Sequence, residues 1–237
     1  LSGLLATMQL SVPVVITFHG SDVNMKKNYI FSRIASRLST ANIFVHRSLS
    51  EKLKIYRNPP NIIPCGFDNN LFYPIPKDKA REILKWEKSK HYIVFSSSFD
   101  NKIKNVQLAW LATSDINNCD LIELKGYGKE QINLILNASD LLLVTSLSET
   151  GPIIVKEALA CNCPIISTNV GDVQKLIQNV QNCYISSYNP EDIKKRINLV
   201  LMKNKRTNGE QAIKNFNLEN IAYKVIEVYK NILNNFS

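Results

Sequence analysis

Short apolar runs alternate with longer segments of mixed polarity along most of this chain. The clearest apolar runs are Val14–Phe18, Asn42–Val45, Tyr92–Phe95, Leu121–Leu124, Leu141–Val144, Pro164–Ile166 and Cys183–Ile185. Runs of this length, bounded by turn residues, are typical of buried strands. The segments between them have the length and periodicity of helices, as in Pro190–Met202. Strands that alternate with helices indicate parallel βαβ units, so the pattern predicts an α/β fold.

The segment from Leu141 to Asp172 is read as strand, loop, helix and strand. In open α/β sheets, ligands bind at the carboxyl ends of the strands, so the loop after Val144 is a candidate site. Pro152 suits the first position of the following helix, which places Gly151 or Thr150 at the cap. The free N–H groups of such a helix start form a seat for an anion.

Glu157 is the unusual residue of this segment. At about 100° per residue it falls on the same arc of the predicted helix as Ile153 and Ile154, with Ala160 and Cys161 beside it. A carboxylate in the buried arc of a helix needs a partner. The alternative is a surface side chain whose stem packs on the protein while its carboxylate reaches water.

Two further turns carry polar residues at the ends of predicted strands. His19-Gly20-Ser21-Asp22 forms a predicted loop after the first strand, and Lys125–Lys129 forms a glycine-containing turn after Leu124. Taken alone, a histidine at a strand end is more often structural than functional. The turn at Lys125–Lys129 is too short for a dinucleotide fingerprint, which needs three spaced glycines.

Composition narrows the classes of protein to consider. With 237 residues and 45% hydrophobic content, the chain has enough material for one large or two small domains. It has no apolar window long enough to span a membrane, and its first residues lack the basic region of a signal peptide, so we expect a protein of the cytoplasm. Five cysteines without a regular framework indicate reduced thiols, and the scattered histidines give no zinc pattern.

The formal charge of +9 suits an anionic substrate, an anionic membrane surface or a nucleic acid. Nucleic-acid binding is not expected, because the chain has no finger spacing, no aromatic RNA-binding stretch and no basic zipper. Anionic small molecules and membrane surfaces remain as the classes of partner.

Glu149 and Glu157 stand eight positions apart in the central segment. Around them lie the sequences SLSET and EALAC, then Pro164 and Val170-Gly171-Asp172. This arrangement resembles the signature of the retaining group 1 (family 4) glycosyltransferases, which have the GT-B fold of two Rossmann-type domains facing a cleft. Segments outside the signature are similar to the same family: Pro64–Asp68 with Phe72 and Pro74, and Leu218–Ala222 with Tyr229.

The resemblance implies a role for each part of the central segment. Glu157 matches the carboxylate that accepts hydrogen bonds from the ribose of a nucleotide sugar. Glu149 matches a catalytic glutamate near the hexose; its alternative is a purely electrostatic role before the helix N-terminus. The turn facing sugar hydroxyls and diphosphate comprises Thr150, Gly151, Pro152 and Ile153.

Residues outside the central segment complete the implied site. Lys104 matches the lysine that neutralises charge on the leaving diphosphate. The family's arginine, five residues before that lysine, is replaced by Phe99, so either Lys102 supplies the second cation or one is missing. His19 matches a catalytic histidine that faces the reaction centre from the first domain. Gly126 and Tyr127 match the turn near the nucleobase.

The resemblance also implies a domain organisation. Residues 1–75 correspond to the first domain and the interdomain segment, with a linker at Asn69–Lys79, and residues 76–216 to the nucleotide-sugar domain. Residues 217–237 correspond to a helix that packs back toward the first domain. The first domain is short and lacks an opening strand with a glycine-rich loop, so we expect an incomplete, N-terminally truncated first domain.

We therefore expect a retaining glycosyltransferase of hexosyltransferase type that moves a sugar from a UDP- or GDP-linked donor to an acceptor hydroxyl. The expected acceptor is a saccharide or a lipid-linked molecule in polysaccharide or lipopolysaccharide assembly, with peripheral contact at the inner face of the membrane. We expect no cofactor and no metal. The alternatives are a nucleotide-sugar-binding module without turnover, another enzyme of the same fold such as an epimerase or phosphorylase, and a basic assembly protein.

Overall fold

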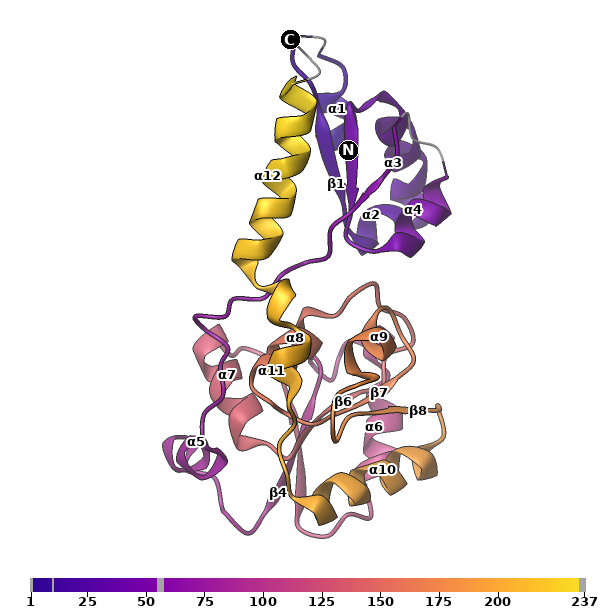
Figure 1. Ribbon diagram of the computed structural model, residues 1–237. Helices are drawn as coiled ribbons and strands as arrows, with labels where there is room; N and C mark the ends of the chain where they lie inside the picture. Colours follow the sequence, from indigo (N-terminus) through magenta and orange to yellow (C-terminus); the bar gives the residue numbers. More distant parts are fainter. Residues whose placement is uncertain (1, 10, 55–57, 235–237) are drawn as a thin grey trace. The chain divides into compact units, whose positions relative to one another are not determined.

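The structure is a computed structural model that describes residues 2–9, 11–54 and 58–234. The chain divides into two compact units: unit 1 comprises Leu1–Gly66 and Leu218–Ser237, and unit 2 comprises Phe67–Asn217. Each unit contains one sheet in which all the strand pairs are parallel (Figure 1). The predicted α/β class is confirmed.

Unit 1 is built on a three-stranded sheet in the order β1-β2-β3. Its strands are β1 (Val15–Phe18), β2 (Ala41–Phe44) and β3 (Asn61–Ile62). Its helices are α1 (Ser2–Ala6), α2 (Gly20–Asn24), α3 (Lys26–Leu38), α4 (Arg47–Leu53) and α12 (Leu218–Asn234). Because side chains alternate along a strand, β1 and β2 supply both faces of the sheet with apolar groups.

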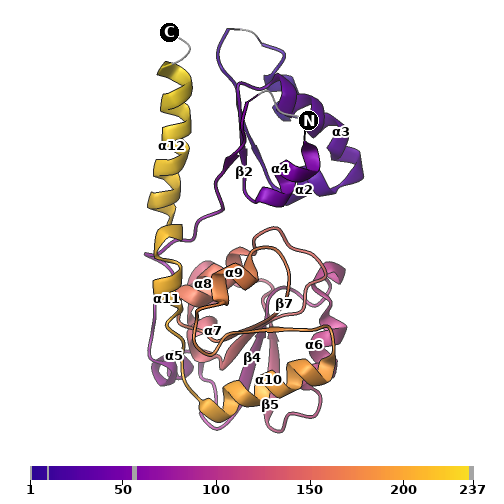
Figure 2. The ribbon, with the colours of Figure 1, turned by 45° about the vertical axis from the view of Figure 1, so that its right-hand side comes forward.

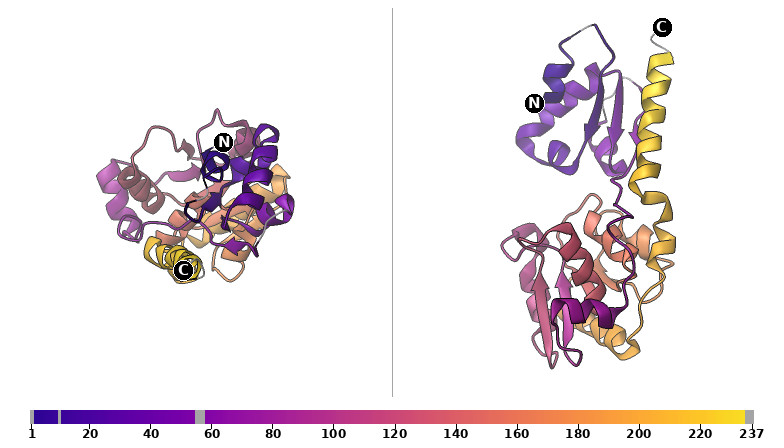
Figure 3. Two further views of the ribbon diagram at one scale, coloured as in Figure 1. Left: turned by 90° about the horizontal axis from the view of Figure 1, so that it is seen from above. Right: turned by 90° about the vertical axis from the view of Figure 1, so that its left-hand side faces the viewer.

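Helices cover both faces of the unit 1 sheet. On one face the rings of Phe18 and Phe44 stack at 5.0 Å, and Leu49 of α4 packs in the same cluster. On the other face Ile43 packs with Val228 of α12. Figures 2 and 3 show α12 running along the face opposite α3 and α4.

Unit 2 contains a five-stranded sheet in the order β5-β4-β6-β7-β8. Its strands are β4 (His91–Phe95), β5 (Cys119–Glu123), β6 (Leu141–Val144), β7 (Ile165–Thr168) and β8 (Tyr184–Ser186). Its helices are α5 (Lys77–Leu84), η1 (Lys102–Lys104), α6 (Val106–Thr113), α7 (Lys129–Ala138), α8 (Ile153–Ala160), α9 (Val173–Ile177), α10 (Pro190–Lys203), α11 (Gly209–Ala212) and η2 (Lys214–Phe216).

The strand order of unit 2 reverses its direction between β4 and β6. The chain goes from β4 outward to β5, then returns past β4 to β6 and continues through β7 to β8. In doubly wound sheets, ligands bind at the carboxyl ends of the strands where the order reverses, which here are the ends of β4 and β6.

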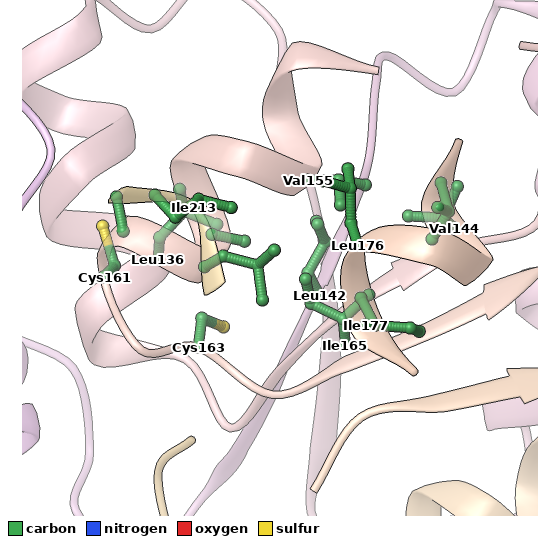
Figure 4. Close-up of a cluster of buried hydrophobic side chains, with 14 of the residues drawn as sticks. Leu136, Leu142, Val144, Val155, Cys161, Cys163, Ile165, Leu176, Ile177 and Ile213 are labelled. Atoms are coloured by element: carbon green, nitrogen blue, oxygen red, sulfur yellow. The ribbon is translucent and has the colours of Figure 1, made fainter. Parts of the chain in front are cut away.

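The two faces of the unit 2 sheet have separate cores. One core joins Leu142 and Ile165 to α7, α8 and α9, and it also holds Cys161 and Cys163 (Figure 4). The other core joins Ile93, Phe95, Leu141, Leu143 and Ile166 to α6 and α10. Neighbouring strand residues such as Leu141 and Leu142 therefore pack on opposite faces, which explains why the strands are apolar runs and not alternating patterns.

The predicted domain boundary at residue 75 needs correction. The structure divides the chain between Gly66 and Phe67, because Phe67 and Phe72 are buried in the core of unit 2. The second boundary falls between Asn217 and Leu218, and α12 is grouped with unit 1. The proline- and lysine-rich composition of residues 69–79 therefore reflects a loop packed on unit 2 and the first residues of α5.

Candidate functional site

The loops that follow β4 and β6 are hydrogen-bonded to each other at the carboxyl edge of the unit 2 sheet. The hydroxyl of Thr145 donates to the carbonyl oxygens of Lys104 and Asn105, at 2.8 and 3.0 Å. The N–H of Leu147 donates to the carbonyl of Ile103 at 2.9 Å. These bonds hold the two loops together at the place where doubly wound sheets bind ligands.

Lys104 and Glu149 form an ion pair across this junction. The Nζ atom of Lys104 lies 2.5 Å from Oε1 of Glu149, and the hydroxyl of Ser146 donates to the same oxygen at 2.9 Å. The side chains are 17% and 14% exposed, so water screens their charges only weakly. The structure thus brings together two of the predicted catalytic residues, and Glu149 bonds to a lysine in place of the helix N-terminus.

Buried polar side chains fix the loop that carries Glu149. The carbonyl of Ser146 accepts from the hydroxyl of Thr168 at 2.9 Å and from that of Tyr188 at 3.0 Å. Thr145, Ser146 and Thr168 are fully buried. Sequence reasoning missed these residues, although the step from the apolar run of β6 to Thr145-Ser146 was a usable signal.

The turn before α8 has a different cap from the predicted one. Helix α8 begins at Ile153, and Pro152 is its N-cap residue with extended backbone angles (φ −67°, ψ 117°). Pro152 has no N–H to donate, so it contributes none of the predicted donors. The N–H groups of Thr150, Gly151 and Ile153 make no hydrogen bond within the described residues. Three unused donors at the positive end of a helix suit an anion.

Glu157 is largely buried, as its place on the helix predicted. The residue is 9% exposed, and among the residues that the structure describes its carboxylate has no hydrogen-bond or ion-pair partner. Burial raises the pKa of Glu157 to about 7, and the charge of Lys129 at the start of α7 opposes that shift. The carboxylate therefore still lacks a partner that donates hydrogen bonds.

A second charged pair lies in the same region and was not predicted from the sequence. Lys156 is fully buried; its Nζ lies 3.9 Å from Oδ2 of Asp172 and 5.3 Å from the ring centre of Phe216. The other carboxylate oxygen of Asp172 is buried and has no hydrogen-bond partner. A lysine next to Glu157, in a helix whose other residues are apolar, was the signal that could have revealed this pair.

Phe99, at the position of the family's arginine, belongs to the hydrophobic core. Its ring packs against Phe95 and Trp110, at centroid distances of 5.6 and 5.5 Å, and its N–H donates to Glu123 at 2.8 Å. Lys102 lies exposed at the first position of η1. Among the described residues, no side-chain contact joins Phe99 or Lys102 to the ion pair of Lys104 and Glu149.

The predicted nucleobase turn lies between β5 and α7. Gly126 has a left-handed backbone (φ 78°), which a side chain would strain, and Tyr127 is 44% exposed. Lys129, which acts electrostatically on Glu157, begins the helix that follows. The end of this turn is thus close enough to Glu157 to influence its ionisation.

His19 lies in unit 1 and is the N-cap residue of α2. The predicted loop at residues 19–22 is a short helix instead, because the backbone N–H of His19 donates to Oδ2 of Asp22 at 2.7 Å and closes the first turn. The imidazole is exposed, with Nδ1 4.0 Å from the sulfur of Cys65. Its catalytic role stays a prediction.

Over residues 2–9, 11–54 and 58–234, no three His, Cys, Asp or Glu side chains gather closely enough to hold a metal ion. Over the same ranges, none of the helices combines the length and apolar content needed to cross a bilayer.

Comparison with known proteins finds a family match that includes Glu149 and Glu157 but not Lys104. Residues 115–216 match the family described as glycosyl transferases group 1. An uncharacterised glycosyltransferase of Methanocaldococcus jannaschii, MJ1178, is 24% identical over 97% of this chain and 72% of its own length. TuaC of Bacillus subtilis, a putative teichuronic acid biosynthesis glycosyltransferase, is 25% identical over 73% of this chain and 51% of its own length.

A solved structure supports the fold. Anabaena HepE in complex with UDP-glucose superposes with a TM-score of 0.75 at 16% identity, covering 97% of this chain and 75% of HepE. At this level of identity the likeness concerns the fold alone. The chain therefore has the α/β fold of GT-B glycosyltransferases, and its residues 115–216 match the glycosyl transferases group 1 family.

Proposed function

We propose that this protein transfers a hexose from a UDP-linked donor to an acceptor hydroxyl with retention of configuration. The observation that carries the proposal is the ion pair of Lys104 and Glu149 beside the unused N–H groups of Thr150, Gly151 and Ile153. The Lys104 ammonium and free backbone N–H groups at the same edge of the sheet suit a diphosphate. The UDP-glucose bound to the structurally similar HepE supports a UDP-linked donor.

Charge redistribution at Lys104 is the proposed source of catalysis. As the bond between the anomeric carbon and the diphosphate oxygen breaks, negative charge develops on that oxygen. The ammonium of Lys104 then interacts more strongly with the leaving group than with Glu149, which lowers the barrier because the interaction grows in the transition state. The acceptor oxygen forms its bond on the face that the diphosphate leaves, and the acceptor proton passes to a departing phosphate oxygen.

Glu157 would bind the ribose of the donor. Ribose hydroxyls are donors, and the buried carboxylate of Glu157 has two oxygens that accept no hydrogen bond within the described chain. Binding would satisfy a buried charge that now lacks a hydrogen-bonding partner, which makes the nucleoside a strong contributor to affinity.

The test compares substitutions of site residues with a matched control. Lys104→Ala, Glu149→Ala and Glu157→Ala are screened with UDP- and GDP-sugars for binding by calorimetry and for transfer by product analysis. Lys194→Ala is the control, because Lys194 of α10 forms an ion pair with Asp115 at 2.8 Å and neither residue belongs to the proposed site. We expect loss of donor binding for Glu157→Ala, loss of turnover for Lys104→Ala and Glu149→Ala, and no change for the control.

Each alternative function predicts a different result. Binding without transfer by the wild-type protein would favour a nucleotide-sugar-binding module, and an epimerised sugar would favour another enzyme of the fold. If all three site substitutions leave both binding and turnover unchanged, the proposal is wrong. Because the positive charge is supplied by Lys104 and the amides, we also propose that no metal takes part, and EDTA should leave the transfer rate unchanged.

We further propose that the acceptor is presented at an anionic lipid surface, as in cell-surface polysaccharide assembly, and that α3 makes the contact. Its residues Ile30, Ile34 and Leu38 are 64%, 45% and 55% exposed on one side of the helix, where Arg33 and Arg37 line the same groove. The helix has no acidic residue. Exposed apolar side chains beside cations are typical of helices that lie on anionic membranes.

Vesicle co-sedimentation tests the lipid contact. The protein should sediment with vesicles that contain phosphatidylglycerol, and not with pure phosphatidylcholine, and added salt should release it. Ile34→Asp should abolish sedimentation. Ile226→Asp on α12, at a position that is also 45% exposed, should not. Equal binding to both kinds of vesicle, or equal effects of the two substitutions, would contradict the contact at α3.

A further inference from the structure

The buried pair of Lys156 and Asp172 lies beside the turn that leads into α8. Lys156 is on α8 itself, and Asp172 is the N-cap residue of α9. Their side chains are 0% and 15% exposed, with Nζ and Oδ2 3.9 Å apart. The proposed reaction assigns no role to either side chain. Burying two charges is costly unless each neutralises the other.

Two glycines show how closely Asp172 approaches the turn. A Cβ atom placed on Gly151 would lie 3.4 Å from Oδ2 and 3.5 Å from Oδ1 of Asp172. A Cβ atom on Gly171 would lie 3.1 Å from the carbonyl carbon and oxygen of Thr150, and Gly171 has a left-handed backbone (φ 55°). The backbone of Gly171 and the carboxylate of Asp172 therefore lie close to the peptides that carry the free N–H groups of Thr150 and Gly151.

This arrangement places a negative charge directly against a proposed anion site. Oδ1 of Asp172 is buried and accepts no hydrogen bond from the residues that the structure describes, so its charge is offset only through Oδ2. The only cation that pairs with Asp172 among the described residues is Lys156. Without Lys156, the carboxylate of Asp172 would repel a diphosphate bound at the turn.

We propose that Lys156 and Asp172 are positioning residues for diphosphate binding. Asp172 holds the Thr150 and Gly151 peptides in place, and Lys156 cancels the charge that Asp172 would otherwise direct at the diphosphate. The inference rests on the proposed function for the identity of the ligand, but the support of the turn by the pair is a property of the protein alone.

The proposal predicts a specific pattern among three variants. Lys156→Met leaves an uncompensated carboxylate, so UDP affinity should fall about tenfold while uridine affinity stays within about twofold. Asp172→Asn removes the charge and should weaken UDP binding less. The double variant should regain most of the UDP affinity lost in Lys156→Met, because it removes the repulsion. A merely structural role would give additive losses shared equally by UDP and uridine.

A second buried pair in the same unit provides the control. Arg81 and Asp140 are 3.0 Å apart with side chains 4% and 6% exposed, at the amino end of the same sheet. Arg81→Met should lower the melting temperature at least as much as Lys156→Met, yet leave the ratio of UDP to uridine affinity unchanged.

Hydrogen exchange separates this inference from the proposed function. In the absence of nucleotide, the peptide that contains Thr150 and Gly151 should exchange faster in Asp172→Asn and Lys156→Met than in the wild type, and not in Arg81→Met. Unchanged exchange there would overturn the inference, as would equal losses of UDP and uridine affinity. If the wild type binds no nucleotide, the proposed function fails and the exchange result alone decides the positioning role. If Lys156→Met does not fold, Asp172→Asn carries the test.

Discussion

Buried carboxylates at the two ends of the unit 2 sheet differ in how many hydrogen-bond and ion-pair partners the chain gives them. At the amino end, Asp140 pairs with Lys77 and with Arg81, whose Nη2 lies 3.0 Å from Oδ2, and it accepts the N–H of Tyr92 at 2.8 Å. At the carboxyl end, Glu157 accepts no hydrogen bond from any described residue, and Asp172 has one buried oxygen without a donor.

The difference separates stability from function. Buried polar groups in folded proteins are normally satisfied, so a saturated carboxylate such as Asp140 is a structural device. Unsatisfied carboxylates next to unused N–H groups indicate a surface built for a ligand that is not part of the chain. Substitutions at the amino end should therefore change stability, and substitutions at the carboxyl end should change binding and rate.

The largest expected effect is at the amino end. Arg81→Met removes one partner of the buried Asp140 and should lower the free energy of unfolding by about 3–5 kcal/mol. The value of kcat should stay within about twofold of the wild type at temperatures where the variant is folded. Urea denaturation and a transfer assay on the same preparation check both statements, and a selective loss of kcat would contradict the division between the ends.

The second effect concerns Lys104 at the carboxyl end. Lys104→Met should lower kcat about 100- to 1,000-fold, because it removes a cation that meets charge developing in the transition state. Its effect on the melting temperature should be small, since Ser146 still donates to Glu149. Steady-state kinetics with a UDP-sugar measures the loss. A variant that unfolds but keeps its kcat would reverse the expected contrast.

Glu157 gives a pH-dependent effect. Its pKa is raised from 4.5 to about 7, so the folded protein binds a proton more tightly than the unfolded chain and loses stability as pH rises through this range. At about 1.4 kcal/mol per pKa unit, the loss is on the order of 2–3 kcal/mol. Glu157→Gln should remove this pH dependence and be more stable than the wild type at pH 8. Urea denaturation at pH 5 and pH 8 provides the comparison.

Nucleotide binding should act on Glu157 in the opposite direction. Ribose hydroxyls favour the ionised carboxylate, so binding should release a proton below pH 7, and UDP affinity should fall between pH 7 and pH 5. Calorimetry in buffers of different ionisation enthalpy detects that proton. A UDP affinity that is independent of pH over this range would contradict ribose binding by Glu157.

The smallest effect is expected at Tyr188. Tyr188→Phe removes one of the two hydrogen bonds to the carbonyl of Ser146, while Thr168 retains the other, so the loss of stability should be about 0.5–1.5 kcal/mol with a slight fall in kcat. Tyr184→Phe is the control, because the hydroxyl of Tyr184 accepts from Lys203 at the surface. A fall in kcat for Tyr184→Phe alone would argue against loop support by Tyr188.

Much of the fold followed from the sequence because burial on both sheet faces leaves long apolar runs. The predicted run Leu141–Val144 coincides with β6, and the burial of Glu157 followed from helical periodicity. The start of α8 was misplaced by one residue, because proline is acceptable both at the cap and at the first position. The domain boundary was misplaced because loop composition does not reveal which unit Phe72 packs against.

The candidate site was less predictable than the fold. The family resemblance indicated Lys104 and Glu149 but not the ion pair between them, which depends on the junction of two loops from separate strands. Lys156 was not predicted as part of an ion pair, because helical periodicity shows which face of a helix is buried but not which residue pairs with it. Its partner Asp172 is the N-cap residue of another helix. Hydrogen bonds such as those of Thr168 depend on strand register, which the sequence does not specify.

The distribution of the cysteines provides each unit with its own reporter of unfolding. Cys65 is the sole cysteine of unit 1 and is half-buried, whereas Cys161 and Cys163 lie fully buried in the core of unit 2. Burial raises the pKa values of both core thiols, so they form reactive thiolates only when that core opens. The rate at which an alkylating reagent modifies each cysteine, read by mass spectrometry, would therefore time the opening of the two units separately in one unmodified chain.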